Sequence, residues 1–188
     1  IIIIASLLRL WQIGNVPASP DWDEVSLGYN AYSIMQTGKD EYGQFLPIVL
    51  RSFDDYKPAL YAYLIIPLIK IFELNILAVR LPSAIFGILT VIATYFLVME
   101  LFRGKKYVDN FAFASSFLLA ISPWHIQFSR IAFESNVGLA FNVFSLLFFL
   151  KGLRSPKYLL LSFFIGSINL YMYQSEKVFV PLLFFLLI

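Results

Sequence analysis

The chain has 188 residues, of which 60% are hydrophobic and only 14% charged, and its mean hydropathy is +0.77. It is therefore far more apolar than an ordinary soluble domain, and we predict an all-α, polytopic transmembrane protein embedded in a lipid bilayer. Twenty Phe and eleven Tyr exclude a disordered chain, and a net charge of +2 excludes the strongly basic surface of a nucleic-acid binder. Without cysteine the chain has no disulfide framework and no thiolate nucleophile.

Both ends of the chain lie inside apolar runs, at residues 1–11 and 178–188. Each run is too short to cross a bilayer core of about 30 Å as a helix. We therefore expect residues 1–188 to be the N-terminal part of one transmembrane domain in a longer protein.

The polar stretch at residues 14–57 holds seven of the twelve acidic residues, so we expect it to lie in water or at the membrane interface. The apolar segment that follows, between Pro58 and Lys70, would rise only about 16 Å as a helix, which is too short to span. Its tyrosines and terminal lysine are typical of a helix lying in the interface. Residues 14–78 are therefore predicted to form a long first outer loop that carries juxtamembrane helices.

Two short basic loops, at residues 103–106 and 151–157, are expected on the cytoplasmic side because cytoplasmic loops are enriched in Lys and Arg. The acidic loop then lies outside. We expect transmembrane helices at about residues 1–13, 79–101, 108–123, 131–150, 158–174 and 178–188.

This topology brings several ionisable residues to the outer ends of helices, where they can converge on one pocket. Such residues at membrane depth are costly and mark a functional site by default. The residues concerned are Asp23, Glu24, Lys57, Arg130, Glu134 and Glu176.

Glu134 falls four residues after Arg130 in an apolar stretch, and this spacing would place both side chains on one face of a helix. The functional interpretation is that Glu134 serves a site. The alternative is that the two residues form a self-neutralising pair that only fixes the helix at the interface.

Asp23 and Glu24 follow Pro20 and precede a helical pattern, so either carboxylate can cap the helix or act as a general base toward a hydroxyl. Lys57 can meet an anionic headgroup or can simply extend its ammonium group to the interface. His125, the only histidine, is better explained as an interfacial anchor than as a metal ligand. One interpretation of Tyr171, Tyr173 and Gln174 is that they contact the substrate. The alternative is that these side chains belong to the belt of residues at the membrane interface.

A series of short motifs resembles the protein mannosyltransferase and aminoarabinose transferase group, which has the glycosyltransferase C superfold. Their order and spacing, rather than any single motif, carry the resemblance, and they extend over the whole chain. The main motifs are Asp23-Glu24, Tyr56-Lys57-Pro58, Arg80-Leu-Pro-Ser-Ala84, Ser122-Pro-Trp-His125, Ser129 to Glu134, and Tyr171-Met-Tyr-Gln-Ser175.

The resemblance implies transfer of a sugar from a polyprenyl-phosphate carrier to an acceptor hydroxyl, with inversion. Asp23 matches the family's first-loop aspartate, Glu24 its acidic neighbour, and Glu134 a second outer carboxylate. Lys57 matches a basic residue that binds the carrier phosphate. Further substrate contacts are expected from Arg130, Tyr56, His125, Tyr173 and Gln174.

The aminoarabinose branch has a metal-binding Glu where this chain has Tyr56, and an Arg where it has Ser26. These departures favour the mannosyltransferase-like branch, so no cofactor is predicted and a divalent metal is disfavoured.

The expected partners are the lipid-linked sugar, the bilayer, and a protein, lipid or glycan acceptor; no nucleic acid is expected. The expected location is the plasma membrane, with the active site on its outer face.

One alternative function is that of another enzyme of lipid-linked sugars, such as a polysaccharide polymerase or ligase. A transporter would instead place ionisable residues near the bilayer midplane, and a structural scaffold would not need Glu134.

Overall fold

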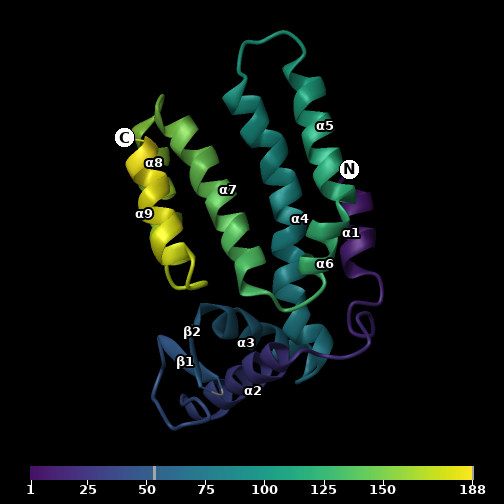
Figure 1. Cartoon of the computed structure of the whole chain (residues 1–188), viewed down its shortest axis with the longest axis vertical. Coiled ribbons are helices and arrows are strands. Elements are labelled where there is room, and N and C mark those ends of the chain that lie inside the picture. The colour runs from purple at the N-terminus through teal and green to yellow at the C-terminus, as the bar shows by residue number, and fades with distance from the viewer. Residues whose placement is uncertain (53, 188) are drawn as a thin grey trace.

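The computed structural model describes residues 1–52 and 54–187. It is a mainly helical protein, as predicted, in which an upright helix bundle stands on a smaller crosswise layer (Figure 1). The bundle contains α1 (Ile2–Leu10), α4 (Ile76–Leu101), α5 (Val108–Ile121), α6 (Pro123–Ser129), α7 (Glu134–Gly152), α8 (Pro156–Asn169) and α9 (Glu176–Leu187), and the crosswise layer contains α2 (Trp22–Thr37), β1 (Val49–Ser52), β2 (Asp55–Pro58) and α3 (Leu60–Phe72).

Among the described residues, two helices, α4 and α7, are long and apolar enough to cross a membrane. A third crossing is possible if α5 and α6 form one span, bent by 60° between them. The expected crossings at residues 1–13, 158–174 and 178–188 correspond to the shorter helices α1, α8 and α9, so these crossings stay predictions.

The predicted helix between Pro58 and Lys70 is present as α3, shifted by two residues. It packs against α2 and α4, and the phenolic hydroxyl of the fully buried Tyr61 donates a hydrogen bond to the Val79 carbonyl at 3.1 Å. Because α3 lies across the end of the bundle, it forms a platform below α4 and α7 rather than a further upright helix (Figure 1).

The outer loop also contains the β1–β2 hairpin, which was not predicted beside its juxtamembrane helices. Its two antiparallel strands pair Leu50 with Lys57 and Arg51 with Tyr56. Leu50 is buried in the same hydrophobic core as α2 and α3, and this burial anchors the hairpin to the platform. The hairpin thereby fixes the position of Lys57.

The predicted helix over residues 131–150 begins later, at Glu134, and residues 131–133 form an irregular connection from α6. Arg130 directly follows α6 and Glu134 begins α7, so the two side chains do not share a helix face. The expectation that both lie on one helix face is therefore wrong, and the alternative of a self-neutralising pair on that face falls with it.

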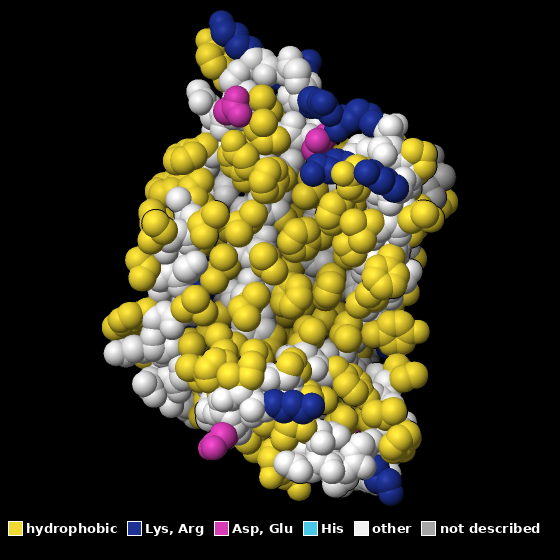
Figure 2. Space-filling view, turned by 180° about the vertical axis from the view of Figure 1, so that it is seen from behind, with side chains coloured by type: hydrophobic (Ala, Val, Ile, Leu, Met, Phe, Trp, Pro, Cys, Tyr) yellow, Lys and Arg dark blue, Asp and Glu magenta, His cyan; other side chains and the backbone are white. Residues whose placement is uncertain are grey.

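The two basic loops lie at the same end of the bundle, opposite the platform (Figure 1). Arg154 of the second loop forms an ion pair with Glu100, near the end of α4 that leads into the first loop. Figure 2 shows Lys and Arg side chains gathered at this end and a broad hydrophobic band across the middle of that face. This distribution is the one expected of a protein whose middle faces lipid.

Candidate functional site

Asp23 and Lys57 meet at the junction of platform and bundle. Asp23 is the second residue of α2, and Lys57 lies in β2. Their side chains form an ion pair, in which the Lys57 side chain is 12% exposed and that of Asp23 is 46% exposed. The hairpin and α2 therefore bring together two residues that the sequence separates by 34 positions.

Glu134 is the third member of this group. It begins α7, is only 3% exposed, and lies within electrostatic reach of Lys57, Asp23 and Asp55. Its Oε1 atom has no hydrogen-bond partner within the described part of the chain. We call Asp23, Lys57 and Glu134 the charged cluster.

Three further predicted residues lie beside the charged cluster. The side-chain amide of Gln174 donates a hydrogen bond to the backbone carbonyl of Tyr56, which precedes Lys57. The Tyr173 ring lies 6.3 Å from that of Phe133, the residue before Glu134. The connection between α8 and α9 thus closes over the hairpin next to the cluster.

Glu24 pairs with Arg80 of α4 instead of joining the Asp23–Lys57 ion pair. Its Oε1 atom accepts a hydrogen bond from Arg80 Nε at 2.8 Å and from the Ala132 backbone N–H at 2.8 Å, while Oε2 accepts from Arg80 Nη2 at 2.9 Å. Oε2 also accepts from the Asp21 backbone N–H at 3.0 Å, which caps α2. Burial by itself would raise the pKa of Glu24, but these hydrogen bonds outweigh it and lower the pKa. This geometry supports the capping alternative for Glu24.

Arg80 holds several segments together through hydrogen bonds, a role that its sequence motif did not predict. It is fully buried, and besides Glu24 it donates hydrogen bonds to the backbone carbonyls of Ile13, Pro17 and Ser19. These contacts fix the segment that leads into α2 and so set the position of Asp23. The sequence feature that could have indicated this role is a single arginine within an apolar stretch, because such a charge requires partners.

Arg130 is likewise used for structure. It is 7% exposed and donates hydrogen bonds of 2.8–2.9 Å to the backbone carbonyls of Leu8, Trp11 and Val16. Its contacts tie α6 to the end of α1, and it forms no ion pair with Glu134 in the described structure.

His125 is 6% exposed and lies inside the bundle rather than in an interfacial belt. Its Nδ1 atom is 2.7 Å from Arg9 Nη2, and its Nε2 atom has no partner among the described residues. It also lines a cavity of about 660 Å³ between α6, α7 and α9.

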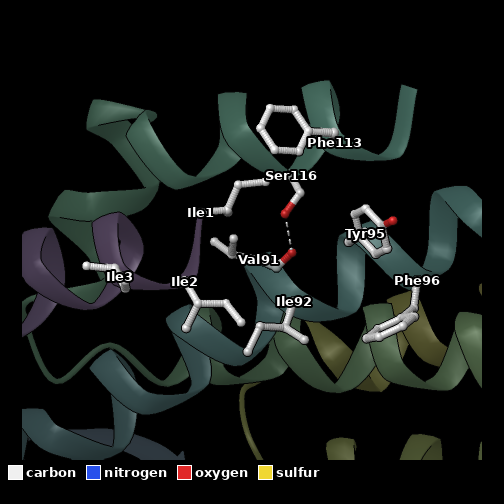
Figure 3. Close-up of a pocket in the computed structure, with 9 residues that line it drawn as sticks. All are labelled: Ile1, Ile2, Ile3, Val91, Ile92, Tyr95, Phe96, Phe113 and Ser116. Atoms are coloured by element: carbon white, nitrogen blue, oxygen red, sulfur yellow. Dashed lines mark hydrogen bonds between the residues drawn. The ribbon is translucent and has the colours of Figure 1, made fainter. Parts of the chain in front are cut away.

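Two of the other hollows in the described structure have mainly apolar walls. One lies between α1, α4 and α5 and has a volume of about 580 Å³. In its wall, the Ser116 hydroxyl donates a hydrogen bond to the Val91 carbonyl at 2.8 Å (Figure 3). Because such a surface suits lipid tails rather than polar substrates, the charged cluster is the better candidate site.

No group of three or more His, Asp or Glu side chains is placed to hold a metal ion in the part of the chain that the structure describes. The charged cluster instead combines two carboxylates with one ammonium group. A carboxylate can accept a proton from a hydroxyl, and an ammonium group can stabilise a departing phosphate.

The profile of the dolichyl-phosphate-mannose-protein mannosyltransferase family matches residues 56–188, which is more than half of the chain. The chain belongs to this family. It is therefore a membrane glycosyltransferase of the mannosyltransferase type, as the resemblance indicated. Lys57 and Glu134 fall within the matched residues, whereas Asp23 and Glu24 precede them. No curated protein and no solved structure matches the chain significantly.

Proposed function

We propose that the protein transfers a sugar from a polyprenyl-phosphate carrier to an acceptor hydroxyl, with inversion, on the outer face of the plasma membrane. The observation that carries this proposal is the Asp23–Lys57 ion pair beside the buried carboxylate of Glu134. This cluster combines a proton acceptor and a cation at the end of the bundle that faces the acidic loop. Membership of the mannosyltransferase family supports the reaction class.

In the proposed reaction, the acceptor oxygen attacks the anomeric carbon while the bond from that carbon to the phosphate oxygen breaks. Asp23 takes the hydroxyl proton, and the electron pair of the broken bond stays on the phosphate. Lys57 stabilises the charge that develops there. Because a single displacement places the acceptor on the opposite face of the sugar, the configuration inverts.

Glu134 supplies the second carboxylate of the charged cluster. Its free Oε1 atom can accept a hydrogen bond from a substrate hydroxyl. Tyr56, Tyr173 and Gln174 form the rim of the site, and Glu24 and Arg130 support it through the backbone segments that they hold.

Replacing Asp23 with Asn should lower sugar transfer by about 10²- to 10⁴-fold, because an amide cannot take the hydroxyl proton. The measurement is turnover of polyprenyl-phosphate-mannose by the full protein in detergent, with expression and melting temperature recorded. Asp54→Asn is the matched control, since Asp54 also lies in the outer loop but is 96% exposed and pairs with Arg51. Near wild-type turnover in Asp23→Asn would refute its role as the base.

Replacing Lys57 with Met should lower turnover by about ten- to a hundredfold, because it removes a charge-assisted contact with the phosphate and keeps the aliphatic stem. The effect should appear in single-turnover transfer and in donor affinity. Lys39→Met, at an exposed position of the same loop, should leave both unchanged. Unaltered donor affinity and turnover in Lys57→Met would place the phosphate site elsewhere.

A further inference from the structure

A cavity of about 660 Å³, with polar side chains set among an otherwise apolar lining, lies between α6, α7 and α9. Its volume is in the range of small-molecule sites. Polar side chains from all three helices line it, among them His125, Asn136, Asn142 and Glu176. Amides, an imidazole and a carboxylate are costly to place in a bundle where lipid or apolar packing would suffice.

His125 is one of the residues that line this cavity, and its ring holds a hydrogen-bonding atom without a partner in the described chain. Arg9 lies 2.7 Å from His125 Nδ1, and a guanidinium group can only donate, so Nδ1 must be the acceptor. The proton of the neutral ring is then on Nε2, which is buried and has no partner in the described chain. A group with a hydrogen-bond acceptor can satisfy it.

Glu176 presents the complementary acceptor. It is 5% exposed, and its Oε2 atom accepts hydrogen bonds from Asn142 Nδ2 at 2.7 Å and Asn169 Nδ2 at 3.0 Å. No described Lys or Arg forms an ion pair with it. A Cβ atom at Gly138 would lie 2.9 Å from Oε1, so glycine leaves room for the carboxylate beside α7.

The cavity adjoins the charged cluster through two shared segments. Phe133 and Ser135, which line it, stand on either side of Glu134. Ser175 and Glu176, which also line it, follow Gln174, whose amide contacts the backbone of Tyr56. A ligand in the cavity would therefore lie next to the residues proposed to act on the donor.

The wall of the cavity also includes aromatic rings. Phe128 and Phe133 stack with centroids 4.7 Å apart, and Trp124 meets Phe128 edge-on at 5.2 Å. A sugar has hydroxyls that both donate and accept and C–H faces that pack on aromatic rings, whereas a lipid tail has no hydrogen-bonding groups.

We infer that this cavity binds the sugar ring of a substrate, with the His125 imidazole and the Glu176 carboxylate holding its hydroxyls. The inference rests on the proposed function, because it names where the transferred or accepting sugar lies. The sugar can come from the lipid-linked donor or from a glycosylated acceptor, and the two sources are separable by experiment.

The first test is protection of an introduced cysteine in the full protein, after sugar transfer by the unmodified protein has been established. Ser175→Cys lines the cavity, and Ser155→Cys lies in the opposite basic loop as the matched control. Both are labelled with a thiol reagent in the presence of polyprenyl-phosphate-mannose, methyl α-mannoside or bare polyprenyl phosphate. If the unmodified protein transfers no sugar, the proposed function fails, and that result is distinct from failure of the cavity assignment.

Slower labelling of Ser175→Cys, by at least about fivefold, with polyprenyl-phosphate-mannose but not with bare polyprenyl phosphate would support a donor-sugar site. Protection by methyl α-mannoside alone would support a site for the acceptor's sugar. Equal protection by the bare carrier, or no protection by any probe, would overturn the inference. Ser155→Cys should label at the same rate throughout.

A second test blocks the cavity without altering its polar groups. Leu139 lines the cavity and is 42% exposed, so Leu139→Trp places a large ring there with little strain on the core. We expect at least a tenfold rise in the KM for the sugar substrate at an unchanged melting temperature. Leu160→Trp, at a 75% exposed position of α8, should behave as the wild type. An unchanged KM in Leu139→Trp would contradict a sugar site.

Discussion

Single buried charges decide the local structure around the charged cluster. The Glu24 carboxylate accepts hydrogen bonds from Arg80, from the N-terminal turn of α2 and from the connection between α6 and α7. Arg80 is fully buried and Glu24 is 2% exposed, so each needs the other. Loss of one partner from such a pair leaves an uncompensated buried charge.

Replacing Glu24 with Gln should therefore destabilise the protein by about 3–5 kcal/mol near neutral pH. Because the pKa of Glu24 is lowered in the folded state, the stabilisation is complete above its ordinary value of 4.5 and is lost as the pH falls through the lower, folded value. The melting temperatures of wild type and Glu24→Gln in detergent should differ by a constant amount above about pH 5 and converge in more acidic buffer.

Glu73→Gln is the matched control for this comparison, since Glu73 is exposed in the same outer loop. Its melting temperature should follow that of the wild type at every pH. Equal stability of Glu24→Gln and wild type at neutral pH would contradict the structural role of the pair.

At the scale of elements, the long helices and the short crosswise helix could be predicted from apolar length alone. The lengths of α3, α4 and α7 follow from predominantly hydrophobic stretches bounded by polar residues. The start of α7 could not be predicted this way, because residues 131–133 are as apolar as the helix that follows. Their backbone leaves the helix since Glu24 accepts the Ala132 N–H, a contact across 108 positions.

The β1–β2 hairpin was missed for a related reason. Each strand has only four residues, and neither shows a clear alternation of polar and apolar side chains. Tertiary packing of Leu50 in the platform core holds the hairpin. The proximity of Asp23, Lys57 and Glu134 was expected from the topology and the order of the motifs. The hydrogen bonds of Arg130 to backbone carbonyls could not be predicted, because backbone acceptors distant in sequence give no local sequence pattern.

The arrangement of elements predicts that the platform and the basic loops face opposite sides of the membrane. A cysteine placed at Gln44 should react with an impermeant thiol reagent from the outside, and one at Lys105 only from the inside. Both positions are exposed. Labelling of both from one side would mean that the chain crosses the membrane a different number of times between them, and the single outer site would be lost.

At the scale of the whole molecule, an apolar band separates a basic end from an end that carries the charged cluster (Figure 2). The platform of α2, α3 and the hairpin closes the bundle at the second end (Figure 1). Under the proposed function, a lipid-anchored headgroup meets the charged cluster and the adjoining cavity at this end. A transporter would instead place its ionisable groups near the membrane midplane. This arrangement agrees with the proposed chemistry on a lipid headgroup at the membrane surface.

The most direct test of the proposed function is to measure sugar transfer by the purified full protein from two donors offered separately. With polyprenyl-phosphate-mannose, we expect release of polyprenyl phosphate coupled to mannose transfer, with inverted anomeric configuration. This transfer should be lost in Asp23→Asn. With a nucleotide-linked mannose we expect no transfer, because the charged cluster offers a single lysine and no binding site for a diphosphate. Transfer from the nucleotide sugar but not from the lipid-linked one, or retention of configuration in the product, would contradict the proposed function.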